Sequence, residues 1–151
     1  MFKHILVGID DSAASRRTVG AAVAIAQSLH AKLELVHAVD EAQLRQARGV
    51  STDDMRNSFN EALVQEGQTA LDHAAAHARE LGVEPLTRLV VSGTQHAAEQ
   101  LAEAVAASGA DLVVVGAHGP RGVGRMLLGS VAEKLARTLT VSLLIVRDTV
   151  D

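Results

Sequence analysis

The feature that most constrains this chain is a regular alternation between short strand-like runs and stretches with helical periodicity. The runs at residues 2–9, 112–116 and 141–146 are almost continuously apolar, and residues 32–39 and 86–92 are also strand-like. A continuous apolar run, rather than one alternating with polar residues, is typical of a strand buried on both faces of a parallel sheet. The alternation therefore predicts an α/β fold.

Apolar residues recur at helical spacing between these runs. Asp11 or Ser12 is expected to cap the first helix, and Asp53 or Asp54 the second. The helices are predicted over residues 12–30, 53–81, 95–108 and 130–139. On the second helix, the residues predicted to face inward are Met55, Phe59, Leu63, Ala70 and Leu81.

The predicted element order is β-α-β-α-β-α-β-α-β, which is that of a doubly wound sheet. We expect an open five-stranded parallel sheet of the flavodoxin or Rossmann-like type, with strand order 3-2-1-4-5 and helices on both faces. A length of 151 residues fits one domain, so residues 1–151 are expected to form a single unit.

Composition argues against several classes of partner. Only 1 % of residues are aromatic and the formal net charge is −4, so stacking on bases and neutralisation of many phosphates are both poor expectations, and no nucleic-acid partner is predicted. Cysteine is absent, which excludes disulfides and thiolate metal sites. No apolar run approaches the roughly 20 residues that span a bilayer, and no leader precedes the first strand, so we predict no membrane insertion and a cytoplasmic location.

The segment from Gly116 to Ser130 carries the strongest chemical signal. It begins at the carboxyl end of an apolar strand and ends where a helix begins, which is the place where doubly wound sheets bind ligands. Glycines let backbone N–H groups approach a phosphate, and the helix start adds unpaired donors and a positive dipole end. The alternative is a simple connection. The side chains expected to assist are those of Ser130, Arg121, Arg125 and His118, although a loop arginine is often only a solvated surface residue.

The loop does not match two common phosphate-binding motifs. Gly129, not lysine, precedes Ser130, so the loop is not a Walker A motif. The first strand ends in Gly8-Ile9-Asp10-Asp11-Ser12, which is not a dinucleotide fingerprint and also lacks the elements of adenylyl-transfer enzymes.

The spacing G-x2-G-x9-G-[ST], met by Gly116, Gly119, Gly129 and Ser130, resembles the ATP-binding signature of the universal stress protein family. The opening KHILVGIDDSAAS and the closing GSVAEKLARTLTVSLLIVR are similar to that family as well. The family often has other residues at Gly8 and Asp11, and a proline at Ser142.

The resemblance implies a role for each matching residue. Asp10 would contact the ribose hydroxyls or a phosphate-bound metal, and main-chain groups of Ala38 and Val39 would read the adenine edge. Ile9 would flank the base, and Gly116 would approach the ribose. The phosphate donors would come from Gly119, Gly129, Ser130 and Val131.

Two of these assignments have alternatives from the residues themselves. Asp10 leads into the same crevice as the Gly116 strand in the predicted strand order, but an aspartate there is also a common helix cap. His73 and His77 stand four residues apart on a predicted helix and could chelate a metal ion, but a solvated helical face is the more common explanation of such a pair. We predict no dedicated metal site, and Mg²⁺ is expected to arrive with the phosphates.

The resulting hypothesis is a nucleotide-dependent regulator or sensor of the stress response that binds ATP, or else ADP or AMP, and acts on an unknown regulatory protein. The alternatives are a nucleotide-independent interaction module of the same fold and a slow ATPase. The last strand, from Val141 to Val146, would be an uncharged sheet edge, so pairing with a second copy is expected to form a homodimer, as the family resemblance also implies.

Overall fold

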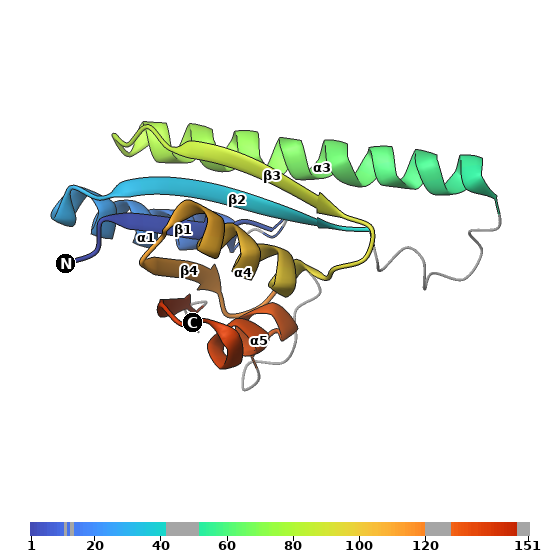
Figure 1. Cartoon of the computed structure of the whole chain (residues 1–151). Coiled ribbons are helices and arrows are strands. Elements are labelled where there is room, and N and C mark those ends of the chain that lie inside the picture. Colours follow the sequence, from blue (N-terminus) through green and yellow to red (C-terminus); the bar gives the residue numbers. More distant parts are fainter. Residues whose placement is uncertain (11, 13, 42–51, 120–127, 148–151) are drawn as a thin grey trace.

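The structure is a computed structural model that describes residues 1–10, 12, 14–41, 52–119 and 128–147 (Figure 1). Strands and helices alternate along these residues as the sequence predicts. The strands are β1 (His4–Gly8), β2 (Lys32–Asp40), β3 (Leu86–Ser92), β4 (Leu112–Gly116) and β5 (Ser142–Val146). The helices are α1 (Ser15–Leu29), α3 (Asp53–Glu80), α4 (Ala97–Ser108) and α5 (Ser130–Thr138).

The five strands form one parallel sheet in the order β3-β2-β1-β4-β5, which confirms the predicted topology. Val7 in the central strand β1 pairs with Leu35 of β2 on one side and with Val114 of β4 on the other. The chain continues from β1 to β2 and β3 on one side of β1, and then crosses to β4 and β5 on the other side. The strand order therefore reverses between β1 and β4. A ligand crevice is expected at such a switch point.

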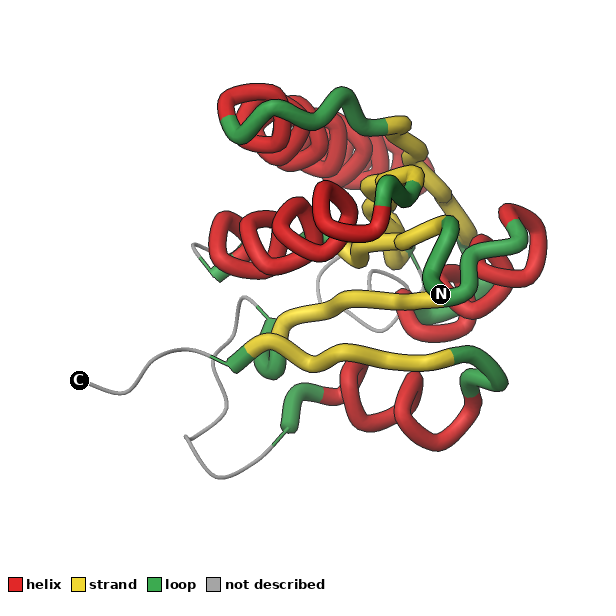
Figure 2. Tube along the Cα trace, turned by 90° about the vertical axis from the view of Figure 1, so that its left-hand side faces the viewer, coloured by secondary structure: helices red, strands yellow, loops and turns green. Residues whose placement is uncertain are grey.

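Helices cover both faces of the sheet (Figure 2). α1 and α3 pack on the face that buries Ile5, Val7 and Leu35, whereas α4 and α5 pack on the face that buries Leu6 and Val36. Successive side chains of one strand point to opposite faces, so a strand covered on both sides must be apolar throughout. This double burial explains the continuous apolar runs of β1 and β4.

α3 and α5 begin at the predicted residues, whereas α1 begins three residues and α4 two residues later than predicted. α1 begins at Ser15 after Ala14, which has no side-chain cap, so Ser12 is not the cap; Asp11 lies outside the described residues. Thr52, rather than Asp53 or Asp54, caps α3 by accepting a hydrogen bond from the Met55 amide at 3.2 Å. α4 begins at Ala97, where His96 and Glu99 form a capping box.

The first turns of α3 extend past the carboxyl ends of the strands (Figure 1). Met55 and Phe59 are therefore 44 % and 48 % exposed, and Leu81 at the other end of the helix is 41 % exposed. The prediction that these three residues face the core is wrong, and for Met55 and Phe59 the reason is that the sheet does not reach under the first turns of a helix of 28 residues. The buried face of α3 lies in its second half, from Gly67 to Ala78.

Among the described residues, none of the helices is both long enough and apolar enough to cross a membrane.

Candidate functional site

The carboxyl ends of β1 and β4 bring two distant parts of the chain together. Asp10 follows β1 and Gly119 follows β4, and a Cβ atom placed on Gly119 would lie 4.0 Å from the Asp10 carboxylate oxygen Oδ2. A ligand crevice is predicted at this switch point, and the ends of β1 and β2 on one side of it are here called the β1–β2 end. On the other side, residues 116–119 and 128–131 form the β4–α5 end.

The Asp10 side chain is held in place by the start of α1. Its Oδ1 accepts a hydrogen bond from the Ser12 amide at 2.8 Å, and the Ser15 hydroxyl lies 3.0 Å from the same oxygen. These contacts hold one carboxylate oxygen at the helix entry while Oδ2 is directed toward Gly119. The sequence presents helix capping and ligand contact as alternatives for Asp10. In the structure one carboxylate oxygen is bonded near the start of α1 and the other is directed toward Gly119, so bonding near the helix start does not prevent ligand contact.

The end of β2 presents main-chain groups to the same crevice. The Ile9 amide donates to the Val36 carbonyl at 2.8 Å, so the main-chain groups of Val36 face β1. Main-chain groups of every second residue in a parallel strand face the same neighbour, so those of Ala38 face the same side, beyond the end of β1. An N–H and a C=O at this place can pair with the edge of a planar base.

Val39 is placed differently from Ala38. Its main-chain groups face β3, and its carbonyl accepts a hydrogen bond from the Gln100 side-chain amide at 2.9 Å. Gln100 is only 4 % exposed and also donates to the Gln95 carbonyl at 3.0 Å. Of the two residues predicted to read the base, the geometry thus favours Ala38, and the buried Gln100 supports the strand from beneath.

The β4–α5 end is held by main-chain hydrogen bonds. The Ala117 amide donates to the Val146 carbonyl at 2.8 Å, and the Gly129 amide donates to the Ala117 carbonyl at 2.6 Å. A Cβ atom on Gly129 would lie 3.2 Å from both the Ala117 carbonyl oxygen and the His118 Cα. Gly129 is therefore required for the close approach of two chain segments.

This arrangement changes the role expected of Gly129. Its N–H group was predicted to donate to a phosphate, but in the structure that group is bonded to Ala117. The donors at this place are instead the first amides of α5, at Ser130 and Val131, because the first four N–H groups of an α-helix have no partner within it. Ser130 is exposed and Val131 is half-buried.

The remaining residues predicted for this loop are only partly described. Gly116 and His118 are half-buried at the end of β4, and Gly119 is exposed beside Asp10. Arg121 and Arg125 lie outside the described residues.

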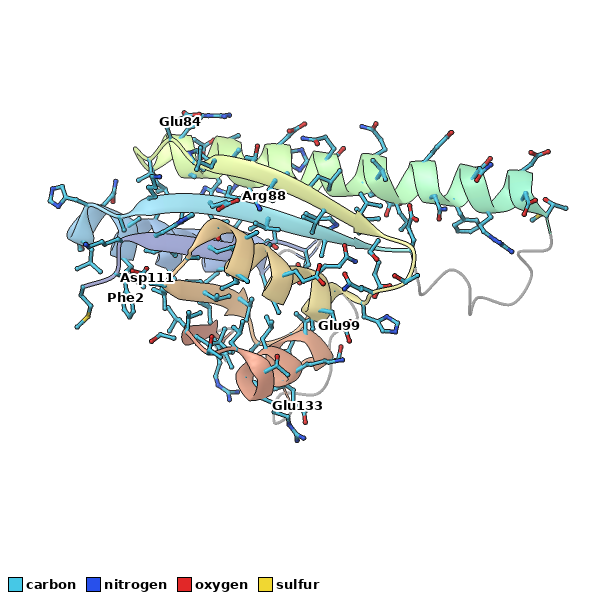
Figure 3. All side chains as sticks on the ribbon, viewed as in Figure 1. Phe2, Glu84, Arg88, Glu99, Asp111 and Glu133 are labelled. Carbon is cyan, nitrogen blue, oxygen red and sulfur yellow. The ribbon has the colours of Figure 1, made fainter. Side chains whose placement is uncertain are left out.

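Contacts between α4 and α5 hold the β4–α5 end against the sheet. Lys134 of α5 forms an ion pair with Glu99 of α4, and Figure 3 shows Glu99 at the end of α4 that lies toward α5. Hydrogen bonding from the Lys134 ammonium lowers the pKa of the Glu99 carboxyl below its ordinary value. The pair is solvent-exposed, so it orients the two helices more than it stabilises the fold.

A cleft of about 310 Å³ adjoins Asp10 on the face covered by α1 and α3. Sequence reasoning did not place Arg16 or His73 at the site. Arg16 directly follows Ser15 at the helix start, whereas the position of His73 follows only from the packing of α3 against α1. The lining residues are Asp10, Ser12, Ser15, Arg16, Ala70, His73 and Ala74.

The two histidines of the pair on α3 have different surroundings. His73 is exposed and lines the cleft, whereas His77 lies 3.6 Å from Glu80 on the same helix. Within the part of the chain that the structure describes, no group of three histidine, aspartate or glutamate side chains is placed to hold a metal ion.

Comparison with known proteins shows which family the chain belongs to. The model of the universal stress protein family matches residues 1–147. This chain belongs to the universal stress protein family. The resemblance to this family that the sequence shows is thereby confirmed over residues 1–147.

Individual relatives show the same relationship. Universal stress protein YxiE from Bacillus subtilis is 31 % identical over 155 residues, which cover 97 % of this chain and all of that protein. The solved structure of the universal stress protein UspA from Lactobacillus plantarum has a TM-score of 0.80 at 20 % identity, and the match covers 97 % of this chain and 98 % of that one. A universal stress protein in complex with cAMP is 28 % identical, with a TM-score of 0.69 and 98 % of each chain covered.

Proposed function

We propose that this universal stress protein binds an adenine nucleotide, with ATP and Mg²⁺ as the preferred form, in the crevice between the β1–β2 end and the β4–α5 end. The observation that carries the proposal is the convergence of Asp10, the main chain of Ala38 and the glycine turn at residues 116–119 on one edge of the sheet. The 28 % identical relative in complex with cAMP supports the same class of ligand.

Each part of the crevice suits one part of the nucleotide. The Asp10 Oδ2 would accept hydrogen bonds from ribose hydroxyls, and the N–H and C=O of Ala38 would pair with the base, which Ile9 would flank. The Ser130 hydroxyl and the amides of Ser130 and Val131 would bind phosphate, where the helix dipole adds positive potential. Mg²⁺ would be held mainly by the phosphate oxygens.

The number of phosphate groups that the site contacts would decide its preference between ATP and AMP. Ser130 and Val131 would provide donors for a phosphate near the helix start, and Arg121 and Arg125 are predicted to place positive charge near the phosphates, which favours the ligand with more of them. Calorimetric titration with ATP, ADP and AMP, each with and without Mg²⁺, tests this order of affinity. Binding of AMP as tightly as ATP would contradict the preference for ATP and leave the adenine site intact.

The same preparation separates the sensor from its alternatives. Binding without release of phosphate over several hours supports a nucleotide-dependent regulator, and multiple turnovers would instead make the protein a slow ATPase. Failure to bind any adenine nucleotide would favour an interaction module.

We also propose a homodimer through β5. This strand is an edge of the sheet, and Leu143, Leu144, Ile145 and Val146 are only half-buried within one chain. Pairing of two such edges would satisfy the open main-chain groups and cover the apolar side chains. Ile145→Lys is expected to shift the sedimenting species from dimer to monomer, and an unchanged dimer would place the interface elsewhere. A role in stress response, an unknown regulatory protein partner and a cytoplasmic location remain predictions.

A further inference from the structure

His37 connects the two strands that form the β1–β2 end. It lies in β2 immediately before Ala38, and its imidazole Nδ1 is 2.8 Å from the carbonyl oxygen of Ile9. A carbonyl oxygen can only accept, so Nδ1 carries the hydrogen and donates it. Ile9 is only 5 % exposed, so its carbonyl would be poorly satisfied without this donor.

Ile9 is thereby bound to β2 through both of its main-chain groups. Its amide donates to the Val36 carbonyl at 2.8 Å, and its carbonyl accepts from the side chain of the next residue, His37. Strand β1 ends at Gly8, but these two hydrogen bonds also join the following residue, Ile9, to β2. The next residue along the chain is Asp10.

The long helix α3 holds the imidazole in place. A Cβ atom on Gly67 would lie 2.6 Å from His37 Cδ2 and 3.0 Å from both His37 Nε2 and Leu89 Cδ1. Gly67 is buried in the middle of a 28-residue helix, where glycine costs about 1 kcal/mol relative to alanine. The close packing against His37 explains why this helix contains a glycine here.

We propose that His37 is a positioning residue for the nucleotide site, and that Gly67 provides the space its imidazole needs. The His37 side chain holds Ile9, which directly precedes Asp10, and His37 itself directly precedes Ala38 in β2. His37 therefore sets the distance between Asp10, the proposed ribose contact, and Ala38, the proposed base contact. The inference rests on the proposed nucleotide site and assigns His37 no direct contact with the ligand.

Two substitutions separate positioning from simple packing. His37→Asn places an amide nitrogen where Nδ1 was but leaves a void beside Gly67, whereas His37→Leu keeps much of the volume and removes the donor. Loss of the hydrogen bond is expected to weaken ATP binding by roughly three- to tenfold in His37→Leu. We expect His37→Asn to bind within about twofold of the wild-type protein although it unfolds at lower denaturant concentration.

A structural role alone would make affinity follow the free energy of unfolding, so His37→Asn, which loses stability, would also bind ATP clearly more weakly than wild-type protein. Equal affinity of His37→Leu and wild-type protein, or weaker binding by His37→Asn than by His37→Leu, would overturn the proposal.

Gly67→Ala provides a second test at a residue that contacts neither Asp10 nor Ala38. The added methyl group should displace the imidazole and weaken ATP binding to about the level of His37→Leu. Gly20→Ala in α1 is the matched control, since a Cβ atom there has no neighbour within 4 Å. Unchanged affinity in Gly67→Ala would count against the proposal.

Hydrogen exchange measured without nucleotide keeps this inference distinct from the proposed function. The Ser12 amide donates to Asp10 Oδ1, so its exchange rate reports the placement of that carboxylate. Faster exchange of Ser12 in His37→Leu than in wild-type protein and in His37→Asn supports positioning even if the wild-type protein binds no nucleotide, whereas equal rates in all three would refute it.

Discussion

The two sides of the crevice are built in opposite ways. At the β1–β2 end, buried or half-buried side chains hold the main chain: His37 bonds to the Ile9 carbonyl, and Gln100 bonds to the Val39 carbonyl. At the β4–α5 end, the main chain holds itself through the bonds of Ala117 to Val146 and of Gly129 to Ala117. Gly129 contributes there by having no side chain.

This contrast determines how each side should respond to substitution. The β4–α5 end is sensitive to added atoms, because two main-chain segments are in contact. The β1–β2 end is sensitive to removed donors, because each donor satisfies a carbonyl that is otherwise buried. An added side chain that separates main-chain segments should have the larger effect.

The largest effect is expected for Gly129→Val. Its Cβ would lie 3.2 to 3.3 Å from main-chain atoms of residues 117, 118 and 119, so these atoms must shift, and the branched side chain adds further atoms to the same close contact. This overpacking should weaken ATP binding on the order of 100-fold, the equivalent of about 3 kcal/mol, which is the upper end for overpacking. Calorimetric titration provides the measurement. Gly20→Ala in α1 is the control, since no described atom lies within 4 Å of a Cβ placed there.

Retention of wild-type affinity by Gly129→Val would refute the assignment of the loop. A loss of affinity in Gly20→Ala as large as that in Gly129→Val would show that the effect is not specific to the contact at Gly129.

The next effect is expected at Asp10. Asp10→Ala removes both carboxylate oxygens and should weaken binding by about ten- to 100-fold, the range for hydrogen bonds to a charged group. Asp10→Asn keeps an oxygen that can accept from the Ser12 amide, so it should retain wild-type stability and still lose affinity. Titration and thermal unfolding of both variants measure the difference. Equal affinity of Asp10→Asn and wild-type protein would show that the negative charge is not used.

A smaller effect is expected at Gln100. Gln100→Leu leaves the carbonyls of Val39 and Gln95 without their donor and should lower the free energy of unfolding by about 1–3 kcal/mol. Nucleotide affinity should fall only a few-fold, because Ala38 rather than Val39 faces the crevice. Urea unfolding measures the first effect, with Gln65→Leu on the exposed face of α3 as the control. If affinity fell more in Gln100→Leu than in Asp10→Ala, the base would have to be read at Val39.

The smallest effect is expected at the opposite edge of the sheet, where Asp111 precedes β4 and lies near Phe2 (Figure 3). The Asp111 carboxylate accepts hydrogen bonds from the amides of His4 at 3.0 Å and Lys3 at 2.9 Å. These bonds lower the pKa of Asp111 below its ordinary value. The ionised form is therefore favoured by folding.

A lowered pKa gives stability that is present at neutral pH and is lost as the pH falls below the ordinary carboxyl pKa, near 4. Asp111→Asn should thus be slightly less stable than wild-type protein at pH 7, and the difference should shrink below about pH 4. Urea unfolding at several pH values measures this. ATP affinity at pH 7 should be unchanged, and a change would mean that the two edges of the sheet are coupled.

Several site residues could be predicted from the sequence because their signals are local. Asp10 follows an apolar strand directly, and Gly116, Gly119, Gly129 and Ser130 form a spaced motif within one loop. The precise roles within that motif could not be predicted, since the bond between the Gly129 amide and the Ala117 carbonyl depends on how the loop closes.

What the sequence by itself determined is the alternation of strands and helices, and with it the parallel sheet and its strand order. The spacing of apolar residues within each short segment indicates whether it is a strand or a helix, and the right-handedness of crossovers leaves few possible topologies. Only the tertiary structure decided that Met55 and Phe59 extend beyond the sheet, that Gln100 supports Val39, and that Gly67 accommodates His37. Each of these depends on contacts between residues about 30 or more positions apart, or on where a neighbouring element ends, and such contacts leave no local pattern in the sequence.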